Sequence, residues 1–188
     1  MIRVRLAATA ALLLLAFASS ACGGGPNPNG PDPSAGFALR VPQTIAGLNV
    51  QQDAKSTATL NKQKGKETYV KDGSVYTLRV GTGSKAELKA VLQVIRLTPD
   101  ARPEDPEFRR TIACLELPGG TCRTPELING AIVYQGVQAP DTKFEQKIYL
   151  WFTGRFMQTL QLPKDTTGAY DPQLLLNQVV AIKPVRAA

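Results

Sequence analysis

The first 22 residues constrain this chain more than any later segment, because they separate an export signal from the part that folds. Met1–Arg5 is short and basic, Leu6–Ala18 is apolar, and Ser19–Ala21 is a run of small residues before Cys22. This order is typical of a secretory signal peptide. The apolar run is shorter than the roughly 20 residues that a membrane-spanning helix needs. We therefore expect residues 1–21 to be removed and the fold to form outside the cytoplasm.

Cys22 and the segment after it indicate how the mature chain is held. The small residues, the cysteine and the Gly23–Gly25 run resemble the lipobox of bacterial lipoproteins, although Ser19 stands where that family usually has an aliphatic residue. The resemblance implies that Cys22 is acylated, with palmitate among the chains, and anchors the protein at the extracytoplasmic face of the cell membrane. The alternative is a general signal-peptidase cut that releases a secreted protein with a free Cys22.

The rest of the chain divides into a tether and one domain. Residues 22–36 hold the lipidated cysteine and a Gly/Pro-rich stretch without hydrophobic periodicity, which is typical of a flexible linker. Residues 37–188 have the length of a single domain. The order of segments is similar to that of small uncharacterised lipoproteins of high-GC Gram-positive bacteria. That similarity rests on the signal region, about a tenth of the chain, and supplies no functional residue.

The hydrophobic pattern of residues 37–188 predicts an α+β domain with an antiparallel sheet of about six strands and two or three helices. Helices are expected at Asp53–Gln63 and after Asp171-Pro172, where Leu175, Leu176, Val179 and Val180 form one apolar stripe. Strands or strand-like segments are expected at Phe37–Gln51, Phe108–Leu117, Ala131–Val137, Phe144–Phe152 and Arg155–Leu162.

Two further elements are predicted from short motifs. Asp72-Gly73 lies between two strand-like runs in Glu67–Val80, and this dipeptide favours a tight hairpin turn. Ser84 and Glu87 have the spacing of a capping box, and the apolar residues at Leu88, Val91, Leu92 and Ile95 then follow a helical period. We therefore expect a hairpin over 67–80 and a helix from Ser84 to Pro99.

The two cysteines beyond the anchor predict a disulfide, because an even pair in an exported domain is usually oxidised. Cys114 and Cys122 lie symmetrically about Pro118. If the chain turns there between two strands, the two cysteines face each other at a distance that a disulfide can span. The sequence thus predicts one hairpin disulfide.

The composition removes several classes of chemistry. The chain contains no histidine, which excludes Ser/His/Asp and Cys/His catalysis and the common zinc-protease site. Gly81-x-Gly83-x-x-Ala86 matches a loose dinucleotide fingerprint, but the strand before it is expected to pair antiparallel, whereas that fingerprint needs a parallel unit. We expect no metal, no cofactor and no enzymatic activity.

Two groups of side chains are candidates for a binding surface. The first is aromatic and consists of Tyr76, Tyr134, Tyr149 and Trp151, which could line a groove or pack in the core. The second is basic and consists of Lys62, Lys64, Lys66 and Lys71, which could contact an anionic membrane surface or form a solvated loop. The net charge of +7 is spread along the chain, so nucleic acid is not an expected partner.

These observations lead to two hypotheses of different classes. The first is a membrane-anchored, non-enzymatic interaction module that docks on an envelope protein or polymer. The second is a carrier of lipid or another small molecule, which would need an apolar cavity between sheet and helices.

Overall fold

The computed structural model describes residues 36–118, 125–164 and 170–186. The helices are α1 (Ala54–Lys64), α2 (Pro106–Glu116) and α3 (Pro172–Val180), with a short 3₁₀ turn, η1, at Gly83–Lys85. The strands are β1 (Phe37–Leu39), β2 (Thr44–Ile45), β3 (Leu48–Gln52), β4 (Val70–Val80), β5 (Glu87–Leu97), β6 (Glu126–Ile128), β7 (Ala131–Gln138), β8 (Gln146–Thr153), β9 (Phe156–Pro163) and β10 (Pro184–Arg186). None of the described helices is long and apolar enough to cross a membrane.

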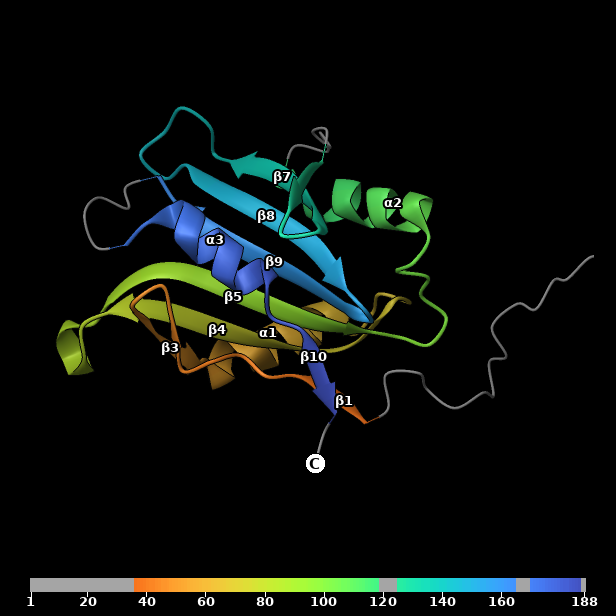
Figure 1. Ribbon diagram of the computed structural model, residues 1–188, viewed down its shortest axis with the longest axis horizontal. Coiled ribbons are helices and arrows are strands. Elements are labelled where there is room, and N and C mark those ends of the chain that lie inside the picture. Colours follow the sequence, from red (N-terminus) through yellow and green to blue (C-terminus); the bar gives the residue numbers. More distant parts are fainter. Residues whose placement is uncertain (1–35, 119–124, 165–169, 187–188) are drawn as a thin grey trace, which may run out of the picture.

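Eight of these strands form one antiparallel sheet, in the order β2-β3-β4-β5-β9-β8-β7-β6, and β1 pairs with β10 in a separate two-stranded sheet. Helix α3 and the β1–β10 pair lie over one face of the large sheet, and α1 and α2 lie over the other (Figure 1). The structure therefore confirms an α+β fold with an antiparallel sheet and three helices, while the main sheet has two strands more than we predicted.

Each face of the sheet has its own core, because alternate side chains of a strand point to opposite faces. On the α3 face, Leu78, Leu92 and Leu160 pack with Leu176 and Val179, all of them nearly inaccessible to solvent. On the other face, a second cluster joins α1 and α2 to the sheet, and it includes Leu60, Val75, Ile95, Ile112, Ala113, Leu117, Leu150 and Met157. The central strands are consequently apolar on both faces.

The helix predicted from Ser84 to Pro99 is wrong: after the single turn η1, residues 87–97 form β5. This strand lies between β4 and β9, and both of its faces are covered. Ala90, Leu92 and Val94 belong to one core, while Ile95 and Leu97 belong to the other. A strand that is apolar on both faces contains apolar residues at nearly every spacing, so it also matches the helical period.

The hairpin predicted at Asp72-Gly73 is also wrong, because β4 runs without a turn from Val70 to Val80. The pairing with β5 shifts register between Val70 and Asp72. Gly73 is needed there for space: a Cβ at this position would lie 2.8 Å from Leu60 Cδ2 and 3.1 Å from the Val94 carbonyl oxygen. The glycine admits α1 close to the strand instead of turning the chain.

The strand predicted at Phe108–Leu117 is helix α2, which Asp105 caps by accepting a hydrogen bond from the Glu107 amide at 2.9 Å. Asp105 and Pro106 form the same N-terminal signature as Asp171 and Pro172 at α3. Cys114 is therefore on a helix, and the hairpin geometry of the predicted disulfide is wrong. Cys122 lies outside the described residues, so the pairing itself stays a prediction.

Several local predictions are confirmed. The helix predicted at Asp53–Gln63 is α1, which Asp53 caps by accepting a hydrogen bond from the Ser56 amide. The strands predicted at Phe144–Phe152 and Arg155–Leu162 are β8 and β9, which pair through a turn at Gly154. The four apolar residues predicted to bury α3 are all buried: Leu175, Leu176, Val179 and Val180.

Candidate binding groove

A polar groove of about 960 Å³ lies where α1 begins, on the face of the sheet that α1 covers. Its floor consists of Asn49 and Gln51 from β3 and of Thr77 and Arg79 from β4. These residues face each other in the register Asn49↔Arg79 and Gln51↔Thr77, which places their side chains on one face of the sheet. One wall is the start of α1, with Lys55. The other is the β4–β5 connection, which contributes Gly81, Thr82, Gly83 and Ala86.

Two floor residues hold the β4–β5 connection in place. Asn49 Nδ2 donates a hydrogen bond to the Gly81 carbonyl at 2.9 Å, and Arg79 Nη1 donates to the Ala86 carbonyl at 3.1 Å. Gly81 and Gly83 adopt positive φ values of 81° and 66°, a conformation that glycine adopts without steric cost. This wall of the groove is thus fixed from the floor by side chains of two adjacent strands.

The third side of the groove is set by the N-terminus of α1. The two carboxylate oxygens of Asp53 accept hydrogen bonds from the Ser56 amide at 2.9 Å and from the Ser56 hydroxyl at 2.8 Å. These bonds, the amide one foremost, hold the pKa of Asp53 below its ordinary value, and the charge of Arg79 acts in the same direction. Asp53 is therefore ionised at neutral pH and engaged within the helix cap.

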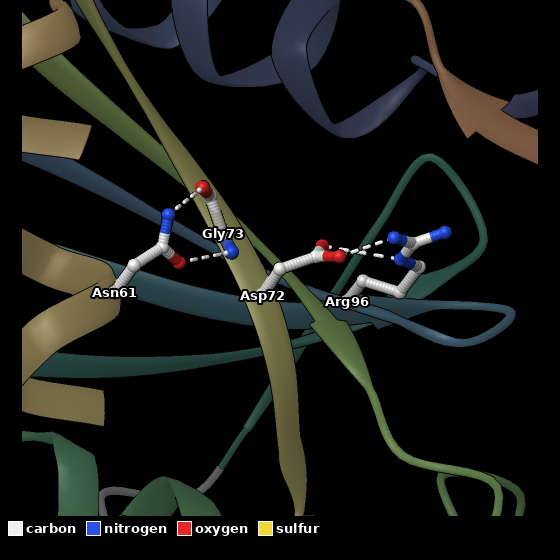
Figure 2. Close-up of polar contacts among 4 residues, drawn as sticks. All are labelled: Asn61, Asp72, Gly73 and Arg96. Atoms are coloured by element: carbon white, nitrogen blue, oxygen red, sulfur yellow. Dashed lines mark hydrogen bonds and ion pairs between the residues drawn. The ribbon is translucent and has the colours of Figure 1, made fainter. Parts of the chain in front are cut away.

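Helix α1 takes the place of a strand beside β4. β3 ends at Gln52, opposite Tyr76, and from there α1 satisfies the edge of β4. The Asp53 amide donates to the Val75 carbonyl, and Thr57 Oγ1 accepts from the Val75 amide at 2.9 Å. Asn61 then binds both backbone groups of Gly73 (Figure 2). These bonds seat the helix, and with it Lys55, against the groove.

A second groove of about 430 Å³ continues along α1 toward β5. Its lining includes Thr59, Gln63 and Gln93, and Lys55 borders both grooves. The two grooves therefore adjoin at Lys55, and the second one is lined by the apolar side chains Leu60, Val75 and Val91 as well.

A buried polar network joins α1 to α2 away from the groove. Lys64 Nζ donates to Glu116 Oε2 at 2.7 Å, and the Tyr69 hydroxyl donates to Glu116 Oε1. Burial, followed by the bond to Glu116, raises the pKa of Tyr69 above its ordinary value of 10.0. The ring of Tyr69 also packs edge-on against Phe108, with 6.4 Å between ring centroids. The network fixes the C-terminal ends of the two helices on the sheet.

The predicted aromatic set does not form one surface. Trp151 has no exposed surface and Tyr134 is 5% exposed, and they belong to the cores on opposite faces of the sheet. Tyr76 and Tyr149 are half-buried on the face of Trp151. These side chains mainly fill the two cores.

The predicted basic set is divided as well. Lys64 is ion-paired with Glu116, whereas Lys62, Lys66 and Lys71 are exposed. Lys62 lies on α1, two helical turns from Lys55. The predicted lipidation site, Cys22, lies outside the described residues.

The groove can bind a polar ligand through several kinds of group. Amides and a hydroxyl at Asn49, Gln51 and Thr77 donate and accept hydrogen bonds, and Lys55 and Arg79 add positive charge. Within the described parts of the chain, no three His, Cys, Asp or Glu side chains lie close enough together to hold a metal. The chain matches no protein-family model, no curated protein and no solved structure.

Sequence reasoning missed this groove because the one motif in its lining, Gly81-x-Gly83-x-x-Ala86, was set aside as a dinucleotide fingerprint and the other lining residues carry none. They are single polar side chains on two strands, a helix start and a turn, brought together by strand pairing. One signal was available: Asn49, Gln51 and Asp53 alternate along the chain, as do Thr77 and Arg79. Such alternation marks a polar face of a strand.

Proposed function

We propose that this protein is a membrane-anchored, non-enzymatic binding module of the cell envelope that holds an envelope partner in the polar groove beside α1. The observation that carries the proposal is the groove of about 960 Å³, floored by paired polar residues of β3 and β4. Its volume lies in the range of ligand sites, roughly 300–1,000 Å³.

The position of the groove suits an anchored protein. Phe37, where the tether would join the domain, lines a small depression with Asp72 and Ser74. The groove lies toward the other end of β4, at Arg79 and Gly81. Seven residues of strand separate Ser74 from Gly81, a length of about 23 Å. The point where the tether would join the domain therefore does not cover the groove, which leaves the groove open to polymers and proteins of the envelope.

The signal peptide, the acylation of Cys22 and the Cys114–Cys122 disulfide belong to the same proposal. The carrier alternative gains less support, because apolar side chains fill the space between sheet and helices. Leu92 and Leu176 on one face, and Leu150 and Met157 on the other, are at most 2% exposed.

Photo-crosslinking in intact cells tests the proposal. A crosslinking amino acid replaces Gln51, an exposed residue of the groove, in the full chain. A matched variant carries it at Lys183, an exposed position between α3 and β10. We expect one dominant crosslinked species from position 51, and we expect this species to be absent when the crosslinker is at position 183. The same diffuse set of neighbours from both positions would contradict the proposal.

A further inference from the structure

We propose that the groove binds an acidic glycan, meaning a hydroxyl-rich chain that carries carboxylate or other anionic groups. This inference rests on the proposed function and specifies the ligand. It follows from the charges, the hydrogen-bonding groups and the extent of the groove.

The charges favour an anion. Lys55 and Arg79 line the groove together with a single carboxylate, Asp53. Both oxygens of that carboxylate already accept hydrogen bonds from Ser56. The bond to Ala86 uses one of the five N–H donors of the Arg79 guanidinium. A guanidinium with further donors can bind a carboxylate or phosphate through two parallel hydrogen bonds.

The uncharged lining favours hydroxyl groups over acyl chains or bases. Asn49 and Gln51 present amides, and Thr77 presents a hydroxyl whose own proton goes to the Gln51 carbonyl at 3.3 Å. Amide and hydroxyl groups of this kind bind sugar hydroxyls. Of the described residues that line the groove, none is aromatic, whereas sites for single-stranded nucleic acid stack bases on aromatic rings. The lining thus matches a hydroxylated chain better than a lipid or a nucleic acid.

The combined length of the two adjoining grooves favours a chain over a single sugar. The second groove continues from Lys55 along α1 to Gln63, and eight residues of helix span about 12 Å. Lys62 is exposed on the same side of α1 as Lys55, seven positions further on. An acidic chain that enters beside Arg79 would pass Lys55 and follow the helix.

Calorimetry on the full chain in detergent micelles tests this ligand class. The probes are polygalacturonate oligomers, neutral dextran oligomers of matched length, and galacturonate monomer as a competitor. We expect binding of polygalacturonate, no heat with dextran, and weak competition by the monomer. Equal binding of dextran, or no binding of polygalacturonate, would overturn the inference.

Three variants locate the binding. Lys55→Gln and Arg79→Gln should each weaken binding of polygalacturonate roughly tenfold, the effect of one lost charge-assisted hydrogen bond. Because Arg79 also supports the turn at Ala86, Lys55→Gln provides the measurement that does not depend on the turn. Lys183→Gln removes the same charge on the other side of the domain and should leave affinity unchanged. An equal loss in Lys183→Gln would overturn the assignment to the groove.

The experiments distinguish a wrong ligand class from a wrong proposed function. A dominant protein crosslink from position 51, together with no binding of polygalacturonate, would overturn the acidic glycan and leave the binding module standing. Diffuse crosslinks with groove-dependent binding of polygalacturonate would contradict docking on a partner in cells and support the ligand class.

Discussion

Asn61 binds both backbone polar groups of Gly73: its Nδ2 donates to the carbonyl at 3.1 Å and its Oδ1 accepts from the amide at 2.7 Å (Figure 2). The amide side chain thereby does what a neighbouring strand would do for β4. This pair explains why α1 can follow directly on β3 and still leave the edge of β4 satisfied. The groove depends on this placement, because α1 provides one of its walls.

Asn61→Ala should destabilise the fold. The substitution removes both bonds and leaves the Gly73 amide and carbonyl without their partner in a partly buried site, which costs about 1–3 kcal/mol. Chemical denaturation of the full chain in micelles measures the free energy of unfolding. Gln63→Ala, on an exposed position of the same helix, is the matched control and should change it by no more than about 0.5 kcal/mol. Equal effects would show that the pair is not a structural contact.

Gly73→Ala should also destabilise, by roughly 1–3 kcal/mol, because the added methyl group would meet Leu60 and the Val94 carbonyl. If contact with Leu60 causes this loss of stability, Leu60→Ala should make room for the added methyl group. In the double variant the loss should then be smaller than the sum of the two single losses. Strict additivity in a double-mutant cycle would contradict the close approach of α1.

The ion pair between Asp72, the residue before Gly73, and Arg96 should contribute less to stability than the bonds of Asn61. Arg96 Nε donates to Asp72 Oδ1 at 3.1 Å, and a second nitrogen contacts the other oxygen (Figure 2). The Arg96 side chain is 30% exposed and the Asp72 side chain is 46% exposed. Ion pairs that are exposed to solvent contribute only about 0–1 kcal/mol to stability. Asp72→Asn should therefore change the free energy of unfolding far less than Asn61→Ala. A larger loss in Asp72→Asn would reverse this ranking.

Tyr69 should make stability depend on alkaline pH. Burial and the bond to Glu116 raise its pKa in the folded chain above the ordinary 10.0. The folded state therefore retains the phenol proton more tightly than the unfolded state. This contribution to stability is complete below pH 10 and is lost as the pH rises above it. Unfolding measured between pH 8 and 11 should show a smaller decline for Tyr69→Phe than for the wild type, and parallel declines would contradict this role.

Local chemistry predicted the start of α1 and α3 correctly, but it predicted a hairpin at Asp72-Gly73 and a helix after Ser84 that the structure does not contain. The Asp171-Pro172 pair marks the start of a predicted helix, whereas the same pair at Asp105-Pro106 does not, because Phe108 and Ile112 also fit a strand face. The helical stripe in Glu87–Leu97 arose from burial on both faces, which no short window reveals. The complete groove could not be predicted from the sequence for a similar reason, because Asn49 lies beside Arg79 only through strand pairing.

Hydrogen exchange of the full chain in its own isolated membranes tests groove occupancy most directly. If an envelope partner fills the groove, amides in residues 49–55 and 81–86 should exchange more slowly in the wild type than in a Lys55→Gln variant, which keeps the bond from Arg79 to the Ala86 carbonyl. Residues 131–137 of β7, which lies near the other edge of the sheet, serve as the internal reference and should exchange equally in both. Identical exchange of the groove segments in the two proteins would contradict binding at this site.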